Sequence, residues 1–152
     1  MRIALYQPDI PQNTGAVLRL AACLGLGVDI IRPCGFPLDD RRIRRSGMDY
    51  ADHVSMTLHD SWEVFQTQRS GRLILLTTRG SVPHTECRYQ PDDILLLGRE
   101  SVGVPENVHA IADVRVRIPI APGLRSLNLA VAAAMVTGEA LRQTGGFSVT
   151  GP

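Results

Sequence analysis

The sequence is poor in cysteine and in aromatic residues, and both shortages limit what the chain can be. Its three cysteines are an odd number without paired spacing, so we expect neither disulfides nor a structural zinc site. His84 and Cys87 have no second pair of ligands near them, so we predict no metal. Three Phe, three Tyr and one Trp are too few for extensive base stacking, which disfavours a general binder of single-stranded nucleic acid.

Long apolar runs and an excess of one charge are also missing. No apolar run reaches membrane-span length, and the N-terminus lacks a charged segment followed by a long apolar core, so we expect a soluble, cytoplasmic protein. The formal net charge is +1, so any affinity for nucleic acid must come from local clustering. A chain of 152 residues that is 44% hydrophobic predicts one domain over 1–152, with 145–152 as a flexible tail.

Short β-rich runs alternate with helical patterns along the chain. The runs lack polar alternation, which is typical of strands buried on both faces, and this predicts an α/β fold with a parallel sheet between two layers of helices. The expected strands are residues 2–6, 28–31, 54–56, 73–77, 94–97 and 114–118. The expected helices are residues 13–24, 39–45, 61–68, 105–110 and 127–143.

The most informative stretch joins the last expected strand to the last expected helix. Residues 118–125 form a loop rich in Pro and Gly, and the helix that follows offers Ser126 and Asn128 in its first turn. A strand, an open loop and a helix start with free backbone donors predict a nucleotide pocket. Two further polar segments with glycines, 77–80 and 98–105, also follow strands. Since ligands collect at the carboxyl ends of such strands, we expect these loops to meet in one site.

Polar residues also open the first expected helix. Asn13 or Thr14 would cap it, and Gly15 would let another backbone approach closely, although ordinary capping explains these residues equally well. Arg19 lies one turn further on among apolar neighbours, so its charge needs a carboxylate in the fold or a phosphate on a ligand. Glu100 would orient Arg19 or bind a ligand, or be a solvated loop carboxylate.

A dinucleotide cofactor is not expected. Such a site needs Gly-x-Gly-x-x-Gly after the first strand, where this chain has Gln-Pro-Asp-Ile-Pro at residues 7–11. The sequence therefore disfavours an NAD or FAD enzyme.

Taken in order, these segments resemble the SPOUT class of RNA methyltransferases. The match is to the compact TrmL (YibK-like) group, which methylates the ribose 2′-oxygen of the tRNA wobble nucleotide. The resemblance covers nearly the whole chain and rests on Asn13-Thr14-Gly15 with Arg19, on 98–105 and on 118–129, with shorter matches at Gly35-Phe36, Asp39-Asp40 and 47–50. It implies a Rossmann-like α/β sheet with a C-terminal deep trefoil knot, which periodicity does not reveal and topology rules would disfavour.

The resemblance also implies the cofactor, the assembly and the site residues. It implies S-adenosylmethionine bound in the knot loops, S-adenosylhomocysteine as product, and a homodimer built by the first and last helices. The implied cofactor contacts are Leu76, Thr77, Gly98, Ile118, Ile120, Ser126 and Leu127. The implied catalytic residues are Arg19, Asn13, Glu100, Ser126 and Asn128. In the dimer, Arg19 would lie near the partner's cofactor. Because a guanidinium stays protonated, we predict that it binds the phosphate beside the reacting ribose.

The implied substrate is the anticodon stem-loop of tRNA, with a cytidine or uridine at the wobble position. The densest basic cluster is formed by Arg41, Arg42, Arg44 and Arg45. It is either a phosphate-binding edge of the dimer or a solvated helix face neutralised in part by neighbouring aspartates. Two other functions stay open: a 2′-O-methyltransferase of ribosomal RNA or of another tRNA site, and a non-catalytic RNA-binding protein that keeps the pocket.

Overall fold

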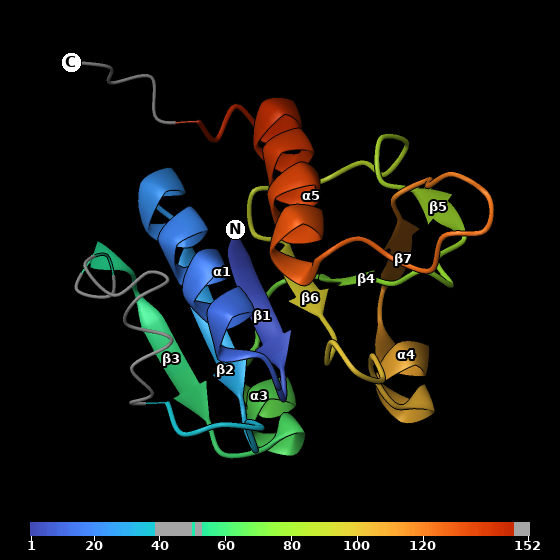
Figure 1. The fold of residues 1–152 in the computed structure, drawn as a ribbon. Helices are drawn as coiled ribbons and strands as arrows, with labels where there is room; N and C mark the ends of the chain where they lie inside the picture. The colour runs from blue at the N-terminus through green and yellow to red at the C-terminus, as the bar shows by residue number, and fades with distance from the viewer. Residues whose placement is uncertain (39–49, 51–52, 148–152) are drawn as a thin grey trace.

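The structure is a computed structural model that describes residues 1–38, 50 and 53–147 (Figure 1). Its strands are β1 (Arg2–Tyr6), β2 (Gly27–Ile31), β3 (Met56–His59), β4 (Leu73–Leu76), β5 (Val82–Pro83), β6 (Ile94–Leu97) and β7 (Val114–Arg117). Its helices are α1 (Pro11–Leu24), α3 (Trp62–Gln68), α4 (Glu106–Ile111) and α5 (Leu129–Thr144). No helix among these residues is both long and apolar enough to cross a membrane.

The strands form one seven-stranded sheet in the order β3-β2-β1-β6-β4-β7-β5, and the described neighbours all pair in parallel. The register aligns the ends of four strands. Leu5 of β1 pairs with Leu97 of β6, Leu97 with Leu76 of β4, and Leu76 with Val116 of β7. The loops that follow these strands therefore leave the sheet along one edge.

Helices cover both faces of the sheet, as the apolar strands predict. Ile3 of β1 packs with Val17 of α1 on one face, while its neighbour Ala4 packs with Phe65 of α3 on the other. Side chains of consecutive strand residues point to opposite faces, so a strand covered twice is apolar throughout. Figure 1 shows α1 and α5 side by side on one face, where they contact each other. The prediction of a parallel α/β fold covered on both faces is confirmed.

Two expected helix starts are wrong by two residues, and those of α3 and α4 are wrong by one. Helix α1 begins at Pro11 and not at Asn13; Ile10 is its N-cap residue, and no side chain caps it. Proline suits the first helical position because its fixed φ is helical and it has no N–H to satisfy, so neither Asn13 nor Thr14 is the cap. Helix α5 begins at Leu129, because the Asn128 side chain accepts hydrogen bonds from the first free backbone amides.

The edges of the sheet differ most from expectation. The strand predicted at 54–56 is β3, Met56–His59, where only His59 is buried. An edge strand has one neighbour and an open face, so its position follows pairing with β2 and leaves no clear hydrophobic pattern. The two-residue strand β5 at the opposite edge was not expected; its Pro83 is tolerated at an edge. The helix expected at 39–45 lies outside the described residues.

Candidate functional site

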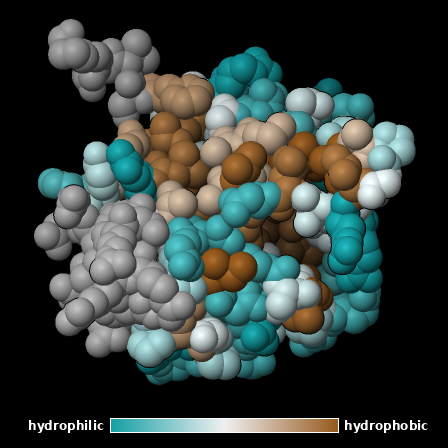
Figure 2. All heavy atoms as spheres, in the orientation of Figure 1, coloured by the Kyte–Doolittle hydropathy of each residue, from teal (hydrophilic) through white to brown (hydrophobic). Residues whose placement is uncertain are grey.

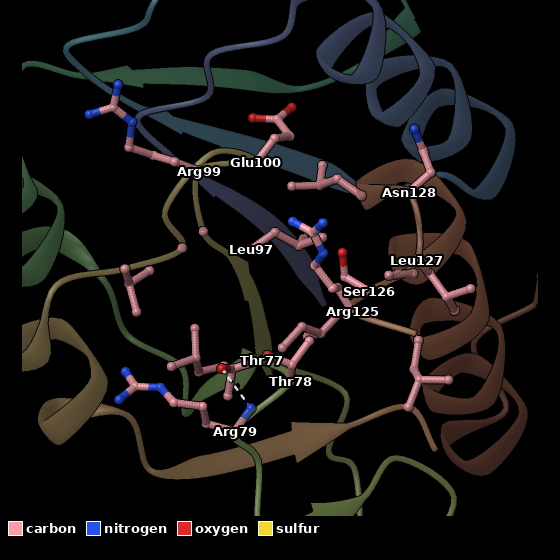
Figure 3. Close-up of a pocket in the computed structure, with 18 of the residues that line it drawn as sticks. Thr77, Thr78, Arg79, Leu97, Arg99, Glu100, Arg125, Ser126, Leu127 and Asn128 are labelled. Carbon is pink, nitrogen blue, oxygen red and sulfur yellow. Dashed lines mark hydrogen bonds between the residues drawn. The ribbon is translucent and has the colours of Figure 1, made fainter. Parts of the chain in front are cut away.

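A cavity of about 580 Å³ opens where the loops after β4, β6 and β7 meet the start of α5 (Figure 3). This volume is in the range of sites for small molecules and cofactors. The cavity is lined by every residue expected to contact the cofactor: Leu76, Thr77, Gly98, Ile118, Ile120, Ser126 and Leu127. The strand register explains why three distant segments converge here.

The loop after β6 turns sharply because two of its positions are glycine. A Cβ atom on Gly98 would lie 2.6 Å from the carbonyl carbon of Gly103, too close for any side chain. Gly103 has a φ of 73°, in the left-handed region that favours glycine. Arg99 and Gly103 exchange backbone hydrogen bonds of 3.0 and 2.8 Å, which close the turn. The backbone of this loop thus forms a tight wall of the cavity.

The loop after β4 is held against β7. Thr77 N donates to Val116 O at 2.9 Å, and the Thr77 hydroxyl accepts from Arg79 N at 3.2 Å, the bond drawn in Figure 3. A Cβ atom on Gly80 would lie 2.4 Å from the carbonyl carbon of Val116. The loop can therefore approach β7 closely only because residue 80 is glycine, and this places Thr77 at the cavity wall.

A one-directional chain of hydrogen bonds joins the cavity to α5. Asn128 Oδ1 accepts from the backbone amides of Ala130 and Val131, so Asn128 Nδ2 must be the donor to Asn13 Oδ1, at 2.9 Å. Asn13 Nδ2 in turn donates to Glu100 Oε1 at 3.1 Å. The side-chain amides of Asn128 and Asn13 therefore each have a single orientation, and this series of hydrogen bonds ends at the Glu100 carboxylate.

Glu100 is the titratable member of this chain. Burial raises its pKa above the usual range for glutamate, and the neighbouring Asp9 carboxyl adds to the increase. The sequence left open whether Glu100 is a solvated carboxylate or orients Arg19. Glu100 is half-buried and its Oε1 accepts from Asn13, so it is not a freely solvated carboxylate, and it does not contact Arg19 of its own chain.

The structure does not bring Arg19 to the cavity of its own chain. Arg19 is exposed on α1 and does not line the cavity; its guanidinium carbon lies 5.0 Å from the centroid of the Tyr50 ring, within range of a cation–π contact. The other residues predicted to be catalytic, Asn13, Glu100, Ser126 and Asn128, all line the cavity. The Arg41, Arg42, Arg44 and Arg45 cluster lies outside the described residues.

Three arginines at the cavity were not predicted: Arg79, Arg99 and Arg125. Arg79 forms an exposed ion pair with Glu106 at 3.2 Å, while Arg125 projects beside Ser126 in Figure 3. All three lie within the loop segments 77–80, 98–105 and 118–125 that the sequence assigns to the site, so their positions in the sequence could have identified them. No cluster of metal-ligating side chains occurs in residues 1–38, 50 and 53–147.

A parallel α/β sheet whose carboxyl-end loops close one glycine-walled cavity beside a helix start is the architecture of SPOUT-class methyltransferases. Residues 1–138 match the model of the SpoU rRNA Methylase family, and the chain belongs to that family.

The relatives include proteins that act on tRNA and on ribosomal RNA. A tRNA (cytidine(34)-2'-O)-methyltransferase of Beijerinckia indica subsp. indica is 59% identical over 149 residues, which are 96% of this chain and 93% of the relative. A solved structure described as "Structural insights into the 2-OH methylation of C/U34 on tRNA" has a TM-score of 0.89 at 44% identity, covering 93% of this chain and 94% of the other. An AdoMet-bound rRNA methyltransferase from Sinorhizobium meliloti has a TM-score of 0.83 at 26% identity, covering 93% and 55%.

Proposed function

We propose that this protein is an S-adenosylmethionine-dependent tRNA methyltransferase that acts on the ribose 2′-hydroxyl of a cytidine or uridine at the anticodon wobble position. The observation that carries the proposal is the 59% identity, over nearly the full length of both chains, to a relative named for that reaction. The cavity at the carboxyl ends of β4, β6 and β7 supports it. An enzyme acting on tRNA is expected in the cytoplasm.

The cavity suits S-adenosylmethionine. Gly98 and Gly103 line the cavity without side chains, so their backbone groups can reach an adenine edge. Apolar side chains such as Ile118 and Leu127 would cover the cofactor, and Ser126 and Thr77 would meet its polar groups. The bound cofactor supplies an activated methyl group, which leaves the protein mainly the task of alignment.

Asn13, Glu100 and Asn128 would orient the ribose. Their hydrogen-bond chain gives each amide one fixed orientation, and a group held in this way directs its remaining donor at a defined place. Arg19 would bind the phosphate next to the reacting nucleotide. That phosphate would accept the hydroxyl proton, because a guanidinium does not act as a base.

A homodimer would complete the site. Val131 is 48% exposed and Met135 42% exposed on the outer face of α5, next to α1, which carries Arg19. Figure 2 shows apolar side chains gathered where α5 lies in Figure 1. Pairing of two such faces would bury this patch and bring Arg19 of one subunit toward the cavity of the other.

We also infer that the C-terminal loops form the trefoil knot. The chain leaves β7 beyond β4 and returns to the opposite side of the cavity, where Asn128 meets Asn13 of α1. Figure 1 displays this return of the 118–128 loop toward α1. A trefoil knot would require this returning segment to pass through the loop that the preceding chain forms after β4 and β6.

The test is methyl transfer from labelled S-adenosylmethionine to total tRNA from a strain that lacks the wobble modification, followed by nucleoside mapping. We expect label in a 2′-O-methylated cytidine or uridine at the wobble position. Label only in ribosomal RNA, offered in parallel, would move the target to that RNA. Binding of RNA without any transfer would leave a non-catalytic protein and refute the proposal.

A further inference from the structure

Asp9, in the loop between β1 and α1, forms a reciprocal clamp with Glu100. Its backbone N–H donates to Glu100 Oε2 at 3.1 Å, while its own Oδ1 accepts from the Glu100 backbone N–H at 3.1 Å. Oδ2 accepts from the Ser101 hydroxyl and faces Arg99 Nε at 3.7 Å. The clamp joins two loops that are 91 positions apart in the sequence.

The loop after β2, which carries Gly35, packs directly against Asp9. A Cβ atom on Gly35 would lie 2.8 Å from the Asp9 Cβ and 2.9 Å from its Cα, and Gly35 N donates to Pro8 O at 2.9 Å. Only glycine fits so close to Asp9. The loop after β2 therefore sets where the Asp9 carboxylate lies, although Gly35 does not line the cavity.

We propose that Asp9 is a positioning residue for methyl transfer, which holds the 98–103 loop and aims Glu100 at Asn13. The proposal rests on the function proposed above. Asp9 does not line the cavity, so it acts through Glu100 and not by touching substrate or cofactor. Its clamp ties the cavity wall to the hydrogen-bond chain that runs from the start of α5 to Glu100.

The charged groups around Glu100 mean that replacing Asp9 should change the pH dependence of activity. Asp9 faces it from the β1–α1 loop, Arg99 belongs to its own loop, and Arg125 lines the same cavity, while its α1 neighbour Asn13 is uncharged. The Asp9 carboxyl is one cause of the raised pKa of Glu100. When Glu100 is protonated, one of its two acceptor oxygens becomes a donor, which weakens the clamp or the bond from Asn13.

The experiment compares Asp9→Asn with wild type in three measurements: kcat/KM for methylation of tRNA against pH, calorimetric titration with S-adenosylmethionine, and thermal unfolding. We expect kcat/KM near neutral pH to fall by about 10- to 100-fold, as for a displaced positioning group. The amide removes a negative charge beside Glu100, so its pKa falls and the acid limb of the pH profile moves to lower pH. Unfolding should change little. Cofactor binding should weaken, because the amide keeps an oxygen for Glu100 N but its nitrogen can neither accept from the Ser101 hydroxyl nor pair with Arg99.

Two further variants separate positioning from general damage. Gly35→Ala pushes on Asp9 but keeps its charge, so activity should fall while the acid limb stays in place. Asp92→Asn makes the same chemical change at an exposed turn before β6 and should match wild type. Activity of Asp9→Asn within twofold of wild type, or a loss with an unmoved acid limb, would overturn the role of Asp9. Wild type that binds the cofactor but methylates no RNA would instead refute the proposed function.

Discussion

Asn128 uses the two ends of its amide for different purposes. Its oxygen caps α5 by accepting from Ala130 N and Val131 N, and its nitrogen donates to Asn13. The sequence predicted a polar residue at the start of this helix but not the division of labour, because the partner Asn13 lies 115 positions away. A cap is a local feature, whereas the bond to Asn13 depends on how two helices pack.

Asn128→Asp should separate the two roles. The carboxylate still accepts the α5 amides and is favoured by the positive end of the helix, so stability should stay within about 1 kcal/mol of wild type. It has no N–H for Asn13, so methyl transfer should fall by at least about tenfold. Urea unfolding and transfer rates measure the two effects. Asn128→Ala should lose both the cap and the activity; full activity of Asn128→Asp would contradict the oriented chain.

Gly98→Ala tests the tight wall of the cavity. The added Cβ would lie 2.6 Å from the Gly103 carbonyl carbon, so the loop must shift. Overpacking of this kind costs about 1–3 kcal/mol, and we expect weaker binding of S-adenosylmethionine by roughly tenfold or more in calorimetric titration. The matched control is Gly138→Ala in α5, where a Cβ atom meets nothing within 4 Å. The control should bind normally and stabilise the helix by about 0.5–1 kcal/mol; equal binding by both variants would show that the wall tolerates a side chain.

At the scale of elements, the strands that are buried on both faces are the ones whose bounds the sequence predicts most closely. Strands β1 and β6 have the predicted bounds, because they lie in the middle of the sheet and are apolar on both faces. Strand β3, at the edge, exposes most of its side chains and was misplaced by the same reasoning. Helix α1 starts earlier than predicted because Pro11, which suits the first helical position, precedes the polar residues expected to cap the helix.

Helix α5 carries a pH-sensitive surface cluster near its C-terminal end. Hydrogen bonds from Arg142 and then Gln143 lower the pKa of Glu139 from 4.5 to about 2. A carboxylate with a lowered pKa stabilises the fold above its unfolded-state pKa, and this contribution is lost as pH falls toward the folded-state value. The relevant window therefore runs from pH 4.5 down to about 2.

Glu139→Gln should consequently lower the melting temperature at pH 7, by a modest amount because its partners Arg142 and Gln143 are exposed to solvent. The difference from wild type should shrink as pH falls from 4.5 toward 2. Thermal unfolding followed by circular dichroism at pH 7, 4.5 and 3 measures it. Glu86→Gln, at an exposed site after β5, is the control. A constant difference at all three pH values would mean that packing and not charge stabilises this end of α5.

At the scale of the whole molecule, one chain gathers most of the predicted site but not all of it. Leu76 at the end of β4 and the loops carrying Gly98 and Ser126 converge because the parallel strands end in one row. A parallel sheet was predictable from apolar runs. Arg19 is different. It lies on the exposed side of α1, and its separation from the cavity depends on three-dimensional packing that no spacing in the sequence encodes.

Mixing two inactive variants tests whether Arg19 acts on the partner's cavity. Arg19→Ala keeps an intact cavity, and Gly98→Val keeps Arg19 but fills the wall beside Gly103. If Arg19 acts across the dimer, a heterodimer has one intact cavity facing one intact Arg19. Random pairing of equal amounts should then restore roughly a quarter of wild-type methyl transfer. If Arg19 served its own cavity, every site in the mixture would lack one component and no activity would return.

A further substitution in both variants provides the control for assembly. Placing a charge on the apolar face of α5 with Met135→Glu in both variants should prevent dimer formation, because an unpaired charge is costly to bury. Sedimentation velocity should then show monomers, and the restored activity should disappear. Restored activity from proteins that sediment as monomers would contradict a shared site, since a monomer has no second chain to supply Arg19.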